Sequence, residues 1–282
     1  FRNVTGVQTC ALPIWQGRDR PARAYLALAG LIVVLSLFPE TISSYSPFSL
    51  STRGALPPGA DHWLGTDYLG RDILSRTLIG GRISVLIGVI SRIGSIAIGL
   101  AIGLITGLSR GPIQRLLNGI IEVFLSIPSL LLALALAMVL GESYETIVIA
   151  IAVGTWAPVA RFVAVKIIVM KNEDFIISAR AIGANPVRIS LFHLLPSLLP
   201  LLIPLLTTGI AASIMMESTL SFLGLAGSAS LNTTPSWGLM IQEGSKFIFD
   251  APWIIIPPSV MLMLLILCFN QVGDRMVTEK KG

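Results

Sequence analysis

Long apolar runs, separated by short charged segments, constrain this chain more than any other feature of its sequence. A helix needs about 20 apolar residues to cross the hydrocarbon core of a bilayer. Charged residues make up only 12% of the 282 residues, about half of what a soluble protein carries. We predict an all-α polytopic membrane protein with about six transmembrane helices. The runs cover residues 24–38 (extending towards 42), 83–108, 116–140, 146–170, 198–225 and 252–272.

The distribution of Lys and Arg decides the predicted orientation. These residues gather in the N-terminal tail, in the loops after the second and fourth runs, and after the last run. Because cytoplasmic segments carry the excess of Lys and Arg, we place both termini in the cytoplasm. The net charge of +5 then reflects topology rather than nucleic-acid binding. The expected partner of the apolar runs is the lipid bilayer.

Four segments follow from this layout. Residues 1–14 contain VTGVQTCALPI, which resembles the translation of a sequencing-library adapter, and we predict that they are not native. Residues 15–82 form an N-terminal cytoplasmic tail, the first transmembrane helix and an outer segment. Residues 83–276 form the helical core, and residues 277–282 form a cytoplasmic tail.

A stripe of small residues marks the second run. Apolar burial gives helices no mutual attraction in lipid, so close helix contacts rely on small side chains. We expect this helix to be packed tightly against others. The stripe consists of Ser91, Ser95, Gly99, Gly103 and Gly107.

The sequence contains no catalytic or metal-binding constellation. His62 and His193 lie on opposite sides of the predicted membrane, and Cys268 is the only cysteine beyond residues 1–14. The chain also lacks the glycine-rich Lys-Ser/Thr loop that cradles nucleotide phosphates. We therefore expect no enzymatic activity, no metal and no cofactor bound by this chain.

Three ionisable side chains, Arg92, Glu122 and Glu217, fall within the predicted spans. A charge in hydrocarbon is costly and usually faces a partner or a water-filled cavity. One hypothesis places them, with Ser218, along a translocation pathway or gate. In the structural alternative, Arg92 pairs with a carboxylate and Glu122 lies near the cytoplasmic interface. For Glu217 the sequence leaves both interpretations open.

Two outer segments are too long to be simple turns. Residues 61–84 are amphipathic and contain several glycines, and residues 234–253 mix tryptophan with polar residues. Aromatic side chains are typical of the membrane–water interface. We expect both segments to lie in that interface or dip into it, with an ordinary surface loop as the alternative. The candidate outer-face residues are Asp67, Arg71, Asp72 and Trp237.

The charged stretch KNEDFIISARAIGANPVRISLFHLLP, residues 171–196, lies between two of the most apolar runs. Asn172 is expected to cap a helix over residues 172–183. A turn at Gly183 follows, and then a second short helix over residues 187–195. A compact helix–turn–helix of this kind is suited to docking in a groove of another protein. A mere connector would not need small residues and a tight turn in this arrangement.

This stretch resembles the EAA loop of bacterial ABC importer permeases. In that pattern a glycine follows the EAA triplet by four residues, and Leu-Pro ends thirteen residues after the glycine. Gly183 and Leu195-Pro196 stand in that register. Ile177-Ser178-Ala179 occupies the EAA positions, so Ile177 and Ser178 depart from the consensus.

Further motifs resemble the C-type permease subunit of the dipeptide, oligopeptide and nickel branch of these importers. The resemblance runs from about residue 22 to the C-terminus, and Glu122 stands where an aspartate is usual. The motifs are HWLGTDYLGRDILSRTLIGGRISVLIG, ESTLSFLGL, PSWGLMIQEG and APWIIIPPSVMLMLLILCFNQVGDRM, beginning at residues 62, 217, 235 and 251.

The resemblance implies the type I ABC importer permease fold and a translocation pathway through the bacterial inner membrane. It also implies partners: a second homologous permease, two cytoplasmic ATPases that use ATP with Mg²⁺, and an extracytoplasmic solute-binding protein that meets the outer segments. The cytoplasmic segment would be the coupling helix. Its ATPase-coupling residues would be Ser178, Ala179, Arg180, Ala181, Gly183, Ala184, Arg188 and Pro196.

Several alternatives remain at this point. Peptides are the favoured substrate because the sequence contains no metal-binding cluster, and nickel or another small solute is the alternative. A stand-alone channel or secondary transporter would use the same buried charges but would leave the docking segment unexplained. A membrane-embedded enzyme is a further alternative, but the sequence lacks the nucleophile–base pair that such an enzyme would need.

Overall fold

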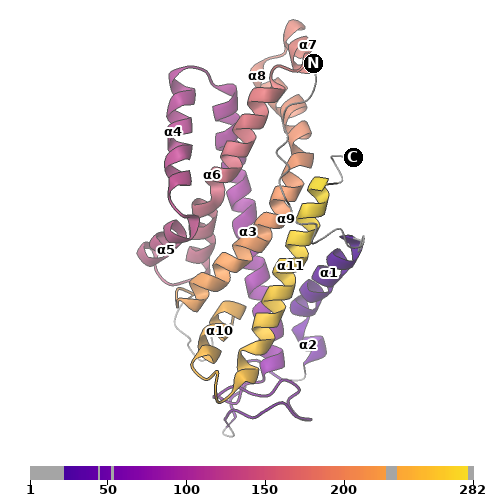
Figure 1. Cartoon of the computed structure of the whole chain (residues 1–282), viewed down its shortest axis with the longest axis vertical. Coiled ribbons are helices and arrows are strands. Elements are labelled where there is room, and N and C mark those ends of the chain that lie inside the picture. The colour runs from indigo at the N-terminus through magenta and orange to yellow at the C-terminus, as the bar shows by residue number, and fades with distance from the viewer. Residues whose placement is uncertain (1–21, 44, 52–53, 227–233, 279–282) are drawn as a thin grey trace, which may run out of the picture.

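The computed structural model describes residues 22–43, 45–51, 54–226 and 234–278. These residues form a bundle of helices elongated along one axis (Figure 1). The hairpin of α7 (Asp174–Ala181) and α8 (Pro186–Ile189) lies at one end, which we call the α7–α8 end. Helix α10 (Trp237–Ser245) lies towards the opposite end, which we call the α10 end. Residues 1–14, predicted to be non-native, lie outside the described residues.

Within the described residues, four helices are long and apolar enough to cross a membrane. Helix α1 is also apolar but shorter, and α2 (Pro39–Ile42) follows it. Helix α9 is preceded without interruption by a π-helical turn, Ser190–Leu194, and α11 by a 3₁₀ turn, Pro252–Ile254. The apolar helices are α1 (Ala22–Leu37), α3 (Ile73–Leu108), α6 (Tyr144–Met170), α9 (Leu195–Phe222) and α11 (Ile256–Thr278).

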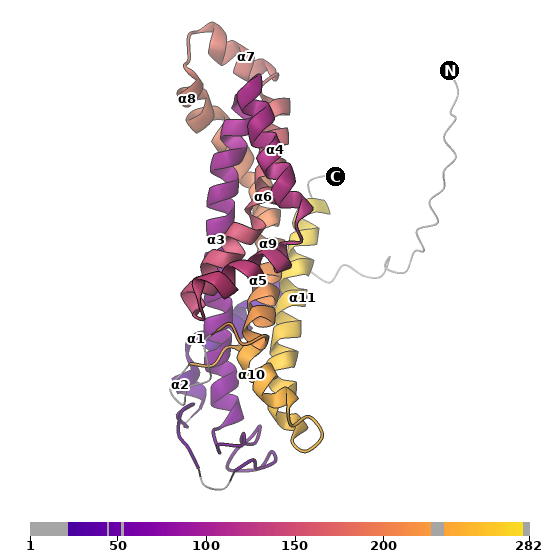
Figure 2. The ribbon, with the colours of Figure 1, turned by 90° about the vertical axis from the view of Figure 1, so that its left-hand side faces the viewer.

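The predicted run over residues 116–140 is not one continuous helix. It divides into α4 (Pro112–Ser126) and α5 (Ser129–Leu140), and the chain bends by 89° between them (Figure 2). A proline disfavours helical backbone at the residue before it. Ile127, before Pro128, is accordingly extended, with φ −95° and ψ 126°. The prediction of a single span here is therefore wrong in shape, and the pair is either a broken span or a re-entrant segment.

Helix α3 begins well before residue 83, where the predicted run starts. The Asp72 carboxylate accepts a hydrogen bond from the backbone N–H of Ser75 at 2.8 Å and so caps the helix at its true start. Residues 61–84 are therefore a loop followed by helix, and the predicted boundary between residues 82 and 83 falls inside α3. Gly80, expected to punctuate the segment, is helical and leaves room for Trp237 of α10.

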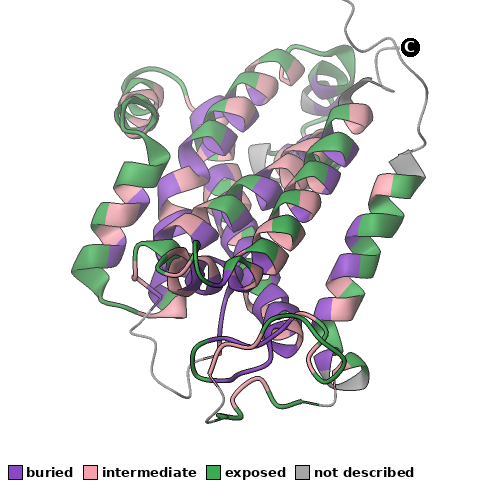
Figure 3. Ribbon diagram, turned by 60° about the horizontal axis from the view of Figure 1, so that its bottom comes forward, coloured by how far each residue is buried: buried purple, intermediate pink, exposed green. Residues whose placement is uncertain are grey.

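The small-residue stripe of α3 packs against α6, as predicted. A Cβ atom at Gly99 would lie 2.6 Å from the Cβ of Val159, and one at Gly103 would lie 2.7 Å from the carbonyl oxygen of Ala160. These distances are too short for real Cβ contacts, so any larger side chain would push the helices apart. Buried residues accordingly face one another between the central helices, and exposed residues lie on the outside of the bundle (Figure 3).

Replacing Gly103 with alanine should destabilise the protein, because the added methyl group meets the α6 backbone. We expect a cost of about 1–3 kcal/mol from overpacking. Gly119→Ala in α4 is the matched control, since a Cβ there meets no atom within 4 Å and alanine favours the helix. Thermal unfolding in detergent measures both changes. Equal stabilities of the two variants would contradict the packing described here.

Candidate functional site

The segment between α6 and α9 folds as a tight hairpin. Gly183 adopts a positive φ of 84°, which glycine accepts without strain. The Ala184 N–H donates to the carbonyl of Ala179 at 3.0 Å and closes the end of α7. The Asn185 side chain then accepts from the N–H of Arg188 at 2.7 Å, as a helix cap does.

Two details of this hairpin differ from the prediction. Asn172 does not cap α7, which begins at Asp174; its side chain bonds back to the carbonyl of Ile168. The predicted second helix over residues 187–195 is not separate, because α8 continues through the π-helical turn into α9. The hairpin is therefore joined to α9 without a flexible break.

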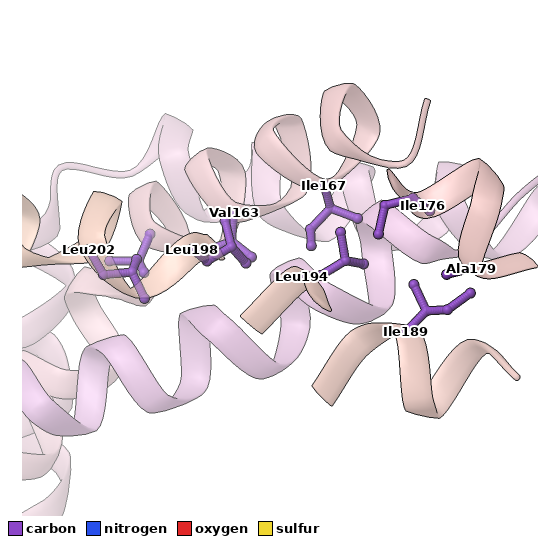
Figure 4. Close-up of a cluster of buried hydrophobic side chains, with 9 residues drawn as sticks. Val163, Ile167, Ile176, Ala179, Ile189, Leu194, Leu198 and Leu202 are labelled. Carbon is purple, nitrogen blue, oxygen red and sulfur yellow. The ribbon is translucent and has the colours of Figure 1, made fainter. Parts of the chain in front are cut away.

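An apolar core fixes the hairpin to the long helices (Figure 4). Ile176 and Ala179 of α7 and Ile189 of α8 are buried in it. Their partners come from α6 and from the start of α9: Val159, Val163, Ile167, Leu194, Leu198 and Leu202. A push on the hairpin is consequently transmitted to α6 and α9, because close-packed side chains leave no room for it to slide.

The outward side of the hairpin is apolar and exposed. Ile182 is 86% exposed at its tip and Phe192 is 70% exposed beside it. The sequence analysis missed both, although an isoleucine directly before the turn glycine is the signal that would have found the tip. Phe175, Ile177 and Leu191 are also exposed.

The predicted coupling residues divide by burial. Ala179 belongs to the buried core. The side chain of Arg180 lies outside the described part of the chain. Ala184 is partly buried against this core. The remainder are exposed on the hairpin or at the start of α9: Ser178, Ala181, Gly183, Arg188 and Pro196.

At the α10 end, two of the predicted outer-face residues belong to a buried network of charges. Arg71 Nε lies 2.6 Å from Asp67 Oδ2. Arg71 Nη2 and Arg76 Nη2 both reach Glu243 Oε2 of α10, at 3.2 and 2.7 Å. In this network the positive charges of the two arginines are offset by the negative charges of the two carboxylates. The network ties the loop before α3 to α10.

The other two predicted outer-face residues are also structural. Asp72 caps α3 and lies 2.9 Å from Nδ1 of His62. The Trp237 indole is fully buried and donates from Nε1 to the carbonyl of Thr77 at 2.8 Å, and its backbone N–H donates to Ser84 Oγ at 3.1 Å. The segment over residues 234–253 is thus partly a packed helix rather than an interfacial loop.

Other side chains form the accessible surface at the α10 end. Phe249 is 97% exposed and Trp63 is 70% exposed, and both lie in loops. The sequence singled out neither. An aromatic residue next to an acidic one or a histidine in a loop, as in Phe249-Asp250 and His62-Trp63, is a signal that would have found them.

Glu217 lies fully buried in α9 and is surrounded by hydroxyl groups. Its carboxylate accepts from Ser221 Oγ at 2.7 Å and from Ser218 Oγ at 3.2 Å. Ser84 of α3 and Ser236, the cap of α10, also hydrogen-bond to it. The carboxylate therefore holds three helices together, and both it and Ser218 are buried among the described residues.

The two other charges predicted within spans separate in the structure. Glu122 is exposed on α4, 3.6 Å from Nη1 of Arg161, which is also exposed. Arg92 is only 8% exposed. It donates to the backbone carbonyl of Leu205 from Nε at 3.1 Å and from Nη2 at 2.6 Å. No carboxylate pairs with Arg92 in the part of the chain that the structure describes, so the predicted pairing is absent there.

Comparison with known proteins supports this arrangement. The sequence profile of the family described as "Binding-protein-dependent transport system inner membrane component" matches residues 99–278. The dipeptide transport system permease protein DppC of Alkalihalophilus pseudofirmus is 37% identical over 256 residues, covering 88% of this chain and 83% of that protein. The oligopeptide transport system permease protein OppC of Bacillus subtilis is 33% identical over 255 residues, covering 88% and 83%.

A glutathione transport system permease protein, GsiD of Escherichia coli, is 36% identical over 246 residues, covering 86% of this chain and 80% of that protein. Among solved structures, an inward-facing form of the MetNI methionine ABC transporter matches with a TM-score of 0.59 and 21% identity. The match covers 72% of this chain and 95% of the solved chain. The predicted all-α type I ABC importer permease fold is confirmed by this likeness.

Replacing Arg76 with methionine should destabilise the α10 end, because Glu243 then loses its closest cation. Removing one member of a buried ion pair costs about 3–5 kcal/mol. Arg82→Met on the exposed side of the same helix is the control and should change stability by less than about 0.5 kcal/mol. Thermal unfolding in detergent distinguishes them. An Arg76→Met variant as stable as the control would refute the network.

Replacing Glu217 with alanine should reduce folded protein in the membrane, because the buried hydroxyls of α3, α9 and α10 lose their shared acceptor. An unsatisfied buried polar group costs about 1–3 kcal/mol. Glu122→Ala, at an exposed position, should leave the amount unchanged. Quantitative blotting of membranes checks both. A Glu217→Ala variant that is abundant and stable but inactive would instead place Glu217 in the pathway.

Proposed function

The chain belongs to the family of inner membrane components of binding-protein-dependent transport systems, and from that premise we propose that it is the permease subunit of an ATP-driven peptide importer. In this proposal it binds no nucleotide itself. Two partner ATPases hydrolyse ATP with Mg²⁺, a second homologous permease completes the pathway, and a solute-binding protein delivers the substrate.

The observation that carries the proposal is the construction of the α7–α8 hairpin. Its inner side is locked into the core with α6 and α9 by Ile176, Ala179 and Ile189. Its outer side presents the exposed apolar tip at Ile182. Exposed apolar residues that project from a rigid support are suited to seating in a pocket of another protein. In this proposal the hairpin tip seats in a cleft of a partner ATPase.

The proposed mechanism follows from that attachment. Closure of the two ATPases on ATP would move the hairpin as a rigid body, and α6 and the first part of α9 would move with it because their side chains interlock. The opposite end of the helices would then open towards the binding protein. This assigns the α7–α8 end, both termini and the ATPases to the cytoplasmic side. The exposed aromatic residues of the α10 end, Trp63 and Phe249, would face the binding protein.

Peptides are the proposed substrate class. The three relatives described above are named for transport of dipeptides, oligopeptides and glutathione, which are all short peptides. This chain also offers no group of three or more His, Cys, Asp or Glu residues placed to hold a metal ion, within its described residues. A bulky and variable substrate suits a pathway with few fixed polar anchors.

Co-purification tests the docking role. The chain would be tagged, expressed with its candidate ATPases and second permease, and extracted in mild detergent. Wild type should retain the ATPases. Ile182→Asp should lose most of them, because it places a charge on the apolar tip; a hot-spot residue is worth about 2 kcal/mol or more, roughly a 30-fold loss of affinity. Ile248→Asp, at an exposed position of the α10 end, is the matched control.

A second variant changes the shape of the hairpin turn without adding a charge. Gly183→Trp should also impair docking, because Gly183 has a positive φ that other residues adopt at a cost. Its membrane insertion should be normal, since a Cβ there meets no atom within 4 Å. Retention of the ATPases by both hairpin variants would contradict the coupling assignment. Wild type that retains no ATPase would contradict the importer assignment itself.

A further inference from the structure

Helix α9 belongs to two different cores. Its first part, with Leu198 and Leu202, packs with α6, the α7–α8 hairpin and partly buried side chains from the later part of α3. Its later part, with Ile210 and Ile214, packs with α1, α3, α10 and α11. The change from one core to the other falls between residues 202 and 210. A movement of the hairpin relative to the α10 end would therefore strain this part of α9.

The backbone of α9 is weakened just before that change. Pro196, Pro200 and Pro204 recur every four residues, so they lie on one face of the helix. Proline has no N–H, and three consecutive bonds of the helical ladder on this face are missing. The π-helical turn Ser190–Leu194 precedes them, with the Leu195 N–H bonded to the Ser190 carbonyl. Prolines and π-helical turns are the usual causes of helix bends.

Hydroxyl groups add side-chain hydrogen bonds to the backbone on both sides of the prolines. Ser197 Oγ donates to the carbonyl of His193 at 2.8 Å. Thr207 and Thr208 both donate to the carbonyl of Pro204, at 3.0 and 2.9 Å. Such side-chain bonds to the preceding turn favour bending of a helix.

Arg92 of α3 holds α9 at the far end of this weakened segment. Two of its nitrogens donate to the single carbonyl of Leu205. Gly209, one turn later, provides the space, because a Cβ there would overlap the guanidinium. A cation this deep in a span is costly. Among the described residues, its hydrogen bonds go to a helix carbonyl, which suits a side chain that holds two helices together.

We propose that Arg92 is a positioning residue that fastens α9 to α3 at Leu205, and that α9 bends between Pro196 and Leu205 during transport. Because Arg92 holds α9 in place at Leu205, the helix bends before that residue. When the hairpin moves, the first part of α9 moves with it while the later part stays on α3. The inference rests on the proposed function, since ATP-driven movement of the hairpin supplies the force.

Distance measurements across the segment test the bend. Spin labels would be attached at Asn172, at the base of the hairpin and outside the proposed docking tip, and at Met215, both exposed, in a background free of other cysteines, and the complete complex would be reconstituted. In wild type the label distance should change when ATP binds. In the double variant Pro200→Ala, Pro204→Ala the change should be roughly halved or less, because the restored N–H groups stiffen the helix.

Pro112→Ala is the control for the proline variant. Pro112 lies in the first turn of α4, where no ladder bond is lost, so its distance change should equal that of wild type. A proline double variant that also behaves like wild type overturns the bend. So does a wild-type complex that hydrolyses ATP without any change in the label distance.

Coupling measurements test the role of Arg92. In Arg92→Gln, peptide transported per ATP hydrolysed should fall about tenfold, within the usual range of coupling between sites, while the ATPases still co-purify. Arg92→Lys should recover part of the loss, because an ammonium can still donate to one carbonyl. Arg82→Gln on the same helix is the control and should match wild type.

Gly209→Ala provides a second route to the same result, in case Arg92→Gln fails to fold. Its added Cβ displaces the guanidinium, whereas alanine itself favours the helix, and it should reproduce the loss of coupling. Normal coupling in Gly209→Ala and Arg92→Gln overturns the positioning role. A raised KM for peptide with an unchanged label distance also overturns it and makes Arg92 a substrate contact. Wild type that binds no ATPase overturns the proposed function, and this inference with it.

Discussion

The close approach of α3 and α6 is the contact on which the rest of this structure depends. Apolar side chains gain nothing by leaving lipid for one another, so these helices need direct backbone contact to associate. Gly99, Gly103 and Gly107 permit it. The α7–α8 hairpin follows α6, α4 packs on α6, and α9 packs on both α3 and α6. The two-helix unit is therefore the frame to which the moving and docking parts are attached.

The two ends of this frame are built by different interactions. The α7–α8 end is held by apolar packing around Ile176 and Ile189, which allows the hairpin to turn as one body. The α10 end is held by ion pairs at Arg76 and by the hydroxyl groups around Glu217. Directional bonds of this kind fix a geometry more strictly than apolar contacts do. An α10 end with fixed geometry and an α7–α8 hairpin that moves as one body suit alternating access.

The sequence was sufficient to predict where most apolar spans, the small-residue stripe and the hairpin lie, because each depends on local composition; the break between α4 and α5 was not predicted. It was insufficient where a distant partner decides the outcome. Arg71 and Trp237 were expected on the outer face, yet Glu243 and Thr77 draw them into the interior. Arg92 was expected to meet a carboxylate and instead meets the carbonyl of Leu205, which no pattern in the sequence identifies.

ATP-driven peptide import can be measured directly as uptake by reconstituted vesicles. The complete complex would be placed in vesicles that contain ATP and Mg²⁺, with binding protein and labelled dipeptide outside. We expect uptake against a gradient that stops when ATP is omitted and when the binding protein is omitted. Uptake that continues without ATP would contradict it and would identify a channel or secondary transporter instead.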